Sequence, residues 1–223
     1  MRWRRKNLTL GTFPADLTRY PRDEARRFGG PAQCARSRHK LTKDAIVLRT
    51  VECEAAVFGC RTIEAHPTAK GGEPDPDCLL AVPGADHLLQ RIPAERWGVI
   101  SPIDVATSQQ HFASAEIPLP GVIIEASGNT AGDYTEAAAR LGADPTFCLA
   151  VEDSPEGVDA ALEIGMKVIG VATVHPADDL ANADMVIPSL HSLHVVGLRP
   201  VLVLEVDALP DVGTFSPGQH KRR

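Results

Sequence analysis

Several features of membrane, redox and common hydrolase proteins are missing from this 223-residue sequence. It has no run of about 18 consecutive apolar residues, so we expect neither a membrane-spanning helix nor a membrane partner. Its five cysteines include no Cys-x-x-Cys pair, which argues against a zinc ribbon and favours reduced thiols in the cytoplasm. The patterns Gly-x-Ser-x-Gly, His-Glu-x-x-His and Gly-x-Gly-x-x-Gly and the P-loop are also absent, so four common enzyme classes lack support.

Charge is spread unevenly along the chain. Residues 1–45 carry 12 Lys and Arg against 4 Asp and Glu, a net charge of +8, and the rest carries 11 against 25, a net charge of −14. A basic arm can contact nucleic acid, but these basic residues are not interleaved with aromatic ones, and no zinc-finger or RNA-binding pattern occurs. We therefore expect a solvated segment without a nucleic-acid partner. The basic start also lacks the apolar part of a secretory signal.

Strand and helix patterns alternate over residues 83–206. Short apolar runs such as WGVIS, GVIIEA and FCLAV are separated by helical stretches such as DYTEAAARLG. Continuous apolar strands between helices indicate a parallel sheet that is covered on both faces. This predicts a doubly wound α/β fold, in which ligands bind at the carboxyl ends of the strands. The run VLVLEV, residues 201–206, is expected to close the series.

Two adjacent carboxylates follow the strand FCLAV directly. Glu152 and Asp153 stand where a parallel strand meets its helix, which is the ligand-binding edge of such a sheet. Carboxylate oxygens there suit Mg²⁺, which is held by one or two carboxylates plus substrate phosphate. A solvated turn, in which Asp153 or Ser154 caps the helix, explains the same residues. The pair by itself favours the turn.

A longer match changes that balance. The segment VEDSPEGVDAALEIGMKVIGVATVHPADDLANADMVIPSLHSL resembles the fourth motif of the haloacid dehalogenase (HAD) superfamily, especially its sugar- and polyol-phosphate phosphatases and β-phosphoglucomutases. The likeness covers about residues 83–196 and continues faintly into 44–66, where VECEAAVFGCRTIEAH resembles the last helix of the family's helical cap. The resemblance implies a HAD-like core with a reduced helical cap. It also implies the lineage of a Mg²⁺-dependent phosphatase.

The resemblance assigns roles to several residues. The family uses a nucleophilic Asp, a second Asp two residues later as general acid/base, a Ser or Thr and a Lys that hold the phosphoryl group, and acidic Mg²⁺ ligands. The Ser/Thr position falls on Ser101, and the acidic motif falls on Glu152 and Asp153, of which Asp153 is the favoured metal ligand. At the Lys position stands Asn129, which can bind phosphate by a hydrogen bond but supplies no charge.

The nucleophile has no clear counterpart. The best-placed remnant of the family's Asp-x-Asp-Gly-Thr motif lies at residues 13–18. It keeps Asp16 as general acid/base and metal ligand, but it puts Pro14, which has no nucleophilic side chain, at the nucleophile position. The strand that carries this motif is central in the family's sheet. We expect either NLTLGTF (7–13) or AIVLRTV (45–51) to fill that place, because an empty place would leave two buried strands with unpaired edges.

Two other acidic pairs copy the spacing. Glu52 and Glu54 follow the apolar run AIVLRTV, although the resemblance puts them on an exposed face of the cap. Asp75 and Asp77 precede their apolar strand instead of following it, which points them to the wrong edge of the sheet. We expect the second pair to lie in a loop.

The expected organisation and function follow from these assignments. We expect four parts: a possible first core strand within 1–18, a helical cap remnant and linker at 19–82, a HAD-like α/β core at 83–206 and a tail at 207–223. The expected function is a phosphatase of small sugar or polyol phosphates, impaired by the missing Asp and Lys, with a small phosphorylated metabolite as its partner. The alternatives are a non-catalytic binding or regulatory protein on the same fold, and a truncated or misread form of an active phosphatase.

Overall fold

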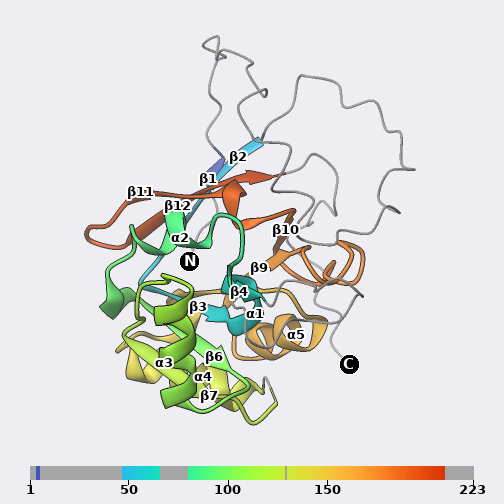
Figure 1. Ribbon diagram of the computed structural model, residues 1–223. Helices are drawn as coiled ribbons and strands as arrows, with labels where there is room; N and C mark the ends of the chain where they lie inside the picture. The colour runs from blue at the N-terminus through green and yellow to red at the C-terminus, as the bar shows by residue number, and fades with distance from the viewer. Residues whose placement is uncertain (1–3, 6–46, 66–79, 129, 209–223) are drawn as a thin grey trace, which may run out of the picture.

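Six parallel strands form the central sheet of the protein, in the order β10-β9-β8-β3-β6-β7 (Figure 1). The computed structural model describes residues 4–5, 47–65, 80–128 and 130–208. The six strands are β3 (Ala55–Gly59), β6 (Trp97–Ser101), β7 (Val122–Glu125), β8 (Cys148–Glu152), β9 (Lys167–Val171) and β10 (Met185–Ile187). The arrangement confirms the doubly wound α/β fold.

Helices connect and cover these strands. They are α1 (Cys60–Ile63), α2 (Ala85–Leu89), α3 (Val105–Ser114), α4 (Ala131–Arg140) and α5 (Pro155–Glu163), with single 3₁₀ turns η4 (Ala94–Arg96), η5 (Pro145–Phe147) and η6 (Leu190–Ser192). Local signals fix where the longer helices begin: Asp104 caps α3, Thr130 and Asp133 form a capping box on α4, and Ser154 caps α5. In the described ranges no helix has the length and apolar content to cross a membrane.

The central strand is the largest departure from the sequence expectations. β3 lies between β6 and β8, so it fills the place expected for NLTLGTF or AIVLRTV. AIVLRTV instead contributes to β2 (Val47–Cys53) of another sheet, and NLTLGTF lies outside the described residues. The interpretation of VECEAAVFGCRTIEAH as a cap helix was therefore wrong. Every residue of β3 is buried, and a short apolar run buried on both faces is typical of a central parallel strand.

A second sheet contains antiparallel strands in the order β1-β2-β12-β11. Besides β2, its strands are β1 (Arg4–Arg5), β11 (Leu193–Gly197) and β12 (Leu202–Ala208); a separate pair joins β4 (Glu64–Ala65) to β5 (Leu80–Ala81). The run VLVLEV was expected to continue the parallel series, but in β12 it pairs antiparallel with β2 and β11. Its Leu202, Leu204 and Val206 are buried and the residues between them are half-buried, which is the period of a strand with one face on the core.

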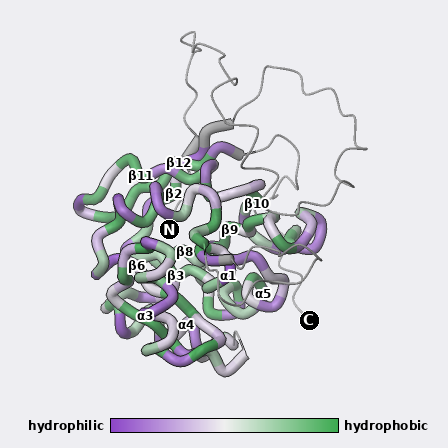
Figure 2. The backbone as a smooth tube through the Cα atoms, in the orientation of Figure 1, coloured by the Kyte–Doolittle hydropathy of each residue, from purple (hydrophilic) through white to green (hydrophobic). Residues whose placement is uncertain are grey.

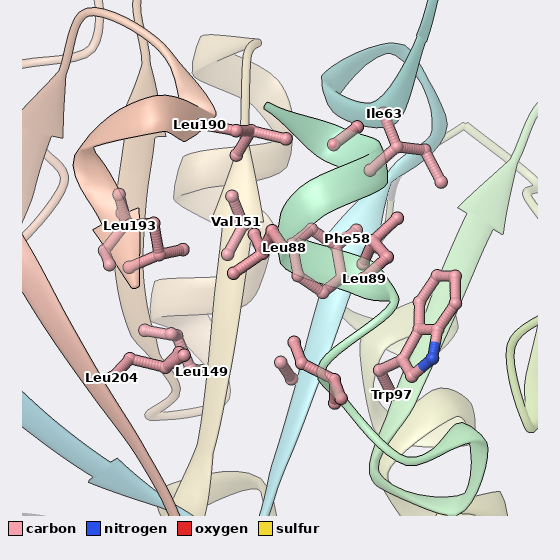
Figure 3. Close-up of a cluster of buried hydrophobic side chains, with 14 of the residues drawn as sticks. Phe58, Ile63, Leu88, Leu89, Trp97, Leu149, Val151, Leu190, Leu193 and Leu204 are labelled. Atoms are coloured by element: carbon pink, nitrogen blue, oxygen red, sulfur yellow. The ribbon is translucent and has the colours of Figure 1, made fainter. Parts of the chain in front are cut away.

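Hydrophobic clusters lie on both faces of the parallel sheet. On one face, Val57 and Ala150 pack with α4 and α5 residues such as Tyr134. On the other, Phe58 and Leu149 lie in one cluster with residues of α2 and of the antiparallel sheet (Figure 3). The strands of the parallel sheet are mostly hydrophobic, and hydrophilic residues gather on the surrounding helices and turns (Figure 2). The parallel sheet is thus covered on both sides, and its carboxyl edge is where a ligand site is expected.

Candidate functional site

Three neighbouring parallel strands end at one edge of the sheet. β3 ends at Gly59, β6 at Ser101 and β8 at Glu152, and Asp153 follows β8 directly. All four residues are buried. The structure therefore brings Ser101, Glu152 and Asp153 together, as the sequence predicted.

The central strand continues as Gly59-Cys60-Arg61-Thr62. In the motif that the sequence resembles, an apolar strand is followed by Asp-x-Asp, and at the end of β3 these two positions fall on Gly59 and Arg61. Sequence reasoning missed both residues because neither is acidic. The signal that was available is the short apolar run of β3 itself.

Glu152 is completely buried beside the end of β3. Its Oε1 accepts a hydrogen bond from the Tyr134 hydroxyl at 2.5 Å, and its Oε2 accepts one from the Ser154 hydroxyl at 3.3 Å. A Cβ atom on Gly59 would clash with Oε1 and would lie 2.9 Å from Cδ and Oε2 of this carboxyl group. Glu152 thus fills the space that a side chain at position 59 would need. Burial raises its pKa to about 7, although the Tyr134 hydrogen bond acts in the opposite direction.

Asp153 forms an ion pair with Arg61 at the same edge. The distance between Arg61 Nε and Asp153 Oδ2 is 3.6 Å, and the exposed fractions of the two side chains are 57% and 3%. Burial raises the pKa of Asp153, whereas the charges of Arg61 and, to a smaller extent, His175 lower it. Oδ2 is buried and has no hydrogen-bond partner among the described residues, so Arg61 is the main compensation for a carboxylate that has lost its water.

Cys60 and Ser101 lie in a second group of polar side chains at this edge. The Cys60 thiol donates a hydrogen bond to Glu64 Oε1 at 2.6 Å, and the Ser108 hydroxyl donates one to Ser101 Oγ at 2.8 Å. Burial raises the pKa of the Cys60 thiol, and the negative charge of Glu64 raises it further. The thiol is therefore protonated at neutral pH and is not an activated nucleophile.

Comparison with known proteins finds relatives in sequence and in fold. No protein-family model matches the chain. It is 31% identical over 135 residues to validoxylamine A 7'-phosphate phosphatase of Streptomyces hygroscopicus subsp. limoneus. The aligned region covers 56% of this chain and 63% of that protein. The chain is 29% identical over 124 residues to hexitol phosphatase A of Escherichia coli, with 52% and 57% covered. A HAD family hydrolase from Deinococcus radiodurans has a TM-score of 0.50 at 18% identity, with 62% of this chain and 92% of that one covered.

This chain is similar in sequence to two curated phosphatases and similar in fold to a HAD family hydrolase. The chain spans less than two thirds of the length of each curated relative that it matches.

The resemblance to HAD phosphatases implies Mg²⁺, and the described residues fit that ion poorly. Both oxygens of Glu152 are engaged by Tyr134 and Ser154, and the charge of Asp153 faces the Arg61 guanidinium. Across the described ranges, no three Asp, Glu, His or Cys side chains are grouped to hold a metal ion. A divalent cation at Asp153 would meet the positive charge of Arg61, so the described residues of this site supply neither the ligands nor the charge for Mg²⁺.

The other residues named from the sequence lie elsewhere. Asp16 and Asn129 are outside the described residues, as are Asp75 and Asp77, so their expected roles stay predictions. Glu54 directly precedes β3. The Glu52 and Glu54 pair therefore lies toward the amino end of the central strand, at the edge opposite the candidate site.

Proposed function

We propose that this HAD-superfamily chain binds a small phosphorylated metabolite of the sugar- or polyol-phosphate class at the carboxyl edge of its parallel sheet. We propose further that it hydrolyses the phosphate ester poorly or not at all. The ligand class is supported by the relatives, whose names are those of phosphatases. The cytoplasmic location expected from the cysteine pattern stays a prediction.

Gly59 carries the proposal of impaired hydrolysis. It stands at the end of the central strand, and it has no side chain that could attack phosphorus. The Glu152 carboxyl group fills the adjoining space, so another side chain at position 59 would displace it. Two residues later, Arg61 replaces a general acid/base with a group that stays protonated. These two positions therefore provide neither the nucleophile for the covalent step nor the general acid/base for the proton transfer.

Two neighbouring groups, the Cys60 thiol and the Ser101 hydroxyl, do not supply a nucleophile. The Cys60 thiol is buried, donates to Glu64 and has a raised pKa. The Ser101 hydroxyl is fully buried and accepts a hydrogen bond from Ser108. A nucleophile of either type needs an adjacent base or a lowered pKa to react at neutral pH.

Arg61 supports the binding part of the proposal. More than half of its side chain is exposed at the edge where the family holds phosphate. A guanidinium carries five N–H donors in a planar fork that matches phosphate oxygens. The ion pair with Asp153, at 3.6 Å, is longer than a good N–H···O hydrogen bond. Arg61 therefore has donors to offer to an incoming anion.

The test measures turnover and binding on the purified full chain. Turnover is followed with a generic aryl phosphate, glycerol 1-phosphate and a hexitol phosphate, each with and without Mg²⁺, and binding of the two metabolites is followed by calorimetry. Asp153→Asn is the matched variant, because it keeps the shape of the side chain and removes its charge. We expect binding of at least one phosphate with no turnover above that of the variant.

Two results would contradict the proposal in different ways. Turnover that requires Mg²⁺ and disappears in Asp153→Asn would show that another group acts as nucleophile, and it would overturn the impaired hydrolysis. A folded chain that binds neither phosphorylated compound would overturn the ligand assignment.

A further inference from the structure

We infer that the Arg61 guanidinium takes the place of a divalent cation beside Asp153, so that this edge of the sheet binds a phosphate group without metal. The phosphate part rests on the function proposed above. The cation part rests only on contacts within the described residues: Asp153 Oδ2 is buried, has no hydrogen-bond partner among them and lies 3.6 Å from Arg61 Nε.

Asp153 requires a positive neighbour because its side chain is 3% exposed. A buried carboxylate without water is stable only when a cation or hydrogen-bond donors compensate its charge. Arg61 supplies that charge from α1, which directly follows β3, the strand next to β8. His175 is the other basic residue that lowers the pKa of Asp153. A metal ion is thus not needed to balance this carboxylate.

The contacts of Glu152 argue against a metal ion bound by both Glu152 and Asp153. Its carboxyl group points toward Gly59 and Gly157, where added Cβ atoms would meet it, and it is bound by Tyr134 and Ser154. Among the described residues, a metal at Asp153 would have one available carboxylate and a guanidinium close to it. Like charges at this distance repel even in water.

The same guanidinium has a solvent-exposed side. Its side chain is 57% exposed while its partner is buried, so one cation contacts the carboxylate and remains open to an anion. Guanidinium groups bind phosphate through two parallel hydrogen bonds. The structure therefore provides positive charge for a phosphate at the place where the family uses a metal and a lysine.

The first experiment tests the cation part with Mn²⁺ as the probe, followed by electron paramagnetic resonance on the full chain. The wild type, Arg61→Ala, Asp153→Asn and the double variant are compared. Arg140→Ala is the control, because it removes an exposed arginine that is ion-paired with Glu136 on α4. We expect Arg61→Ala to bind Mn²⁺ at least about tenfold more tightly than the wild type. The double variant and the control should show no gain.

The second experiment tests the phosphate part. Binding of inorganic phosphate and glycerol 1-phosphate is measured by calorimetry in EDTA and again in excess Mg²⁺. We expect the wild-type affinity to be the same in both buffers and to fall about tenfold in Arg61→Ala, the usual loss for a charged hydrogen bond. Arg61→Lys should keep part of the affinity, because it keeps the charge but not the fork.

The outcomes separate the inference from the proposed function. Equal Mn²⁺ affinity in the wild type and Arg61→Ala, or phosphate binding that appears only with Mg²⁺, would overturn the inference. Absence of phosphate binding in both buffers would overturn the proposed function and the phosphate part together, whereas a Mn²⁺ gain in Arg61→Ala that depends on Asp153 would still support the cation part.

Discussion

Replacing Glu152 with glutamine should remove a pH dependence from the stability of the fold. Glu152 is fully buried, and burial raises its pKa from the ordinary value of 4.5 to about 7. Its carboxyl group accepts hydrogen bonds from Tyr134 and Ser154. Glutamine keeps the shape and an acceptor oxygen for Tyr134, and it does not titrate. The variant therefore isolates the ionisation of this one group.

The sign and size of the effect follow from the two pKa values. Between pH 4.5 and 7 the unfolded chain releases the Glu152 proton and the folded chain keeps it, so the unfolding free energy falls as pH rises. Each pKa unit corresponds to about 1.4 kcal/mol. The shift from 4.5 to about 7 therefore predicts a loss of about 3 kcal/mol across this range. That loss is complete above the folded-state pKa.

The assay is urea unfolding of the wild type and Glu152→Gln at half-unit steps from pH 4.5 to 8. Groups that do not interact with Glu152 titrate alike in both proteins, so the difference between their unfolding free energies reports Glu152 and its interaction with Asp153. We expect the variant to gain about 3 kcal/mol relative to the wild type over this range. Most of that gain should fall below pH 7.

Parallel curves for the two proteins would refute the reasoning. They would mean that the pKa of Glu152 is not raised in the folded state, and hence that the carboxyl group is not buried away from water. In that case the space beside Gly59 would be open, and the structural support for impaired hydrolysis would be lost.

Three further substitutions test the contacts that shape the site and the core. Gly59→Asp should destabilise the fold by about 1–3 kcal/mol, because its Cβ would clash with Glu152. In the Glu152→Ala background the same substitution should cost much less. Equal costs in both backgrounds would contradict the clash. Phe58→Ala should cost about 3–5 kcal/mol, since the ring is fully buried and packs edge-on against Trp97; thermal unfolding checks this, and a loss below 1 kcal/mol would be inconsistent with it. Asp133→Ala should cost about 1–2 kcal/mol through the α4 capping box, seen as a lower urea midpoint at unchanged slope; no change in midpoint would rule out the cap.

Local patterns were sufficient for the part of the site that follows β6 and β8. Ser101 ends a short apolar run, and Glu152 and Asp153 end another. Both runs are bounded by helical stretches, so their carboxyl ends could be placed at one edge from the sequence. The parallel sheet itself followed from the same alternation.

The central strand was not predictable by these means. Ala55–Gly59 is apolar and short, and such a run can pair with any open strand edge. Its place between β6 and β8 depends on contacts with residues far away in the chain. A resemblance to a cap helix led the interpretation in the wrong direction, because the acidic residues that mark the central strand of the family are missing here.

The sequence by itself determined the strand and helix periods, the strand ends that carry Ser101, Glu152 and Asp153, and the HAD-like core they imply. Only the tertiary structure decided that Gly59 and Arg61 occupy the central edge, that Glu152 turns inward to Tyr134, and that Arg61 meets Asp153. The reason is physical. Periodicity is a property of neighbouring residues, whereas strand order and the balance of a buried charge depend on residues that only folding brings together.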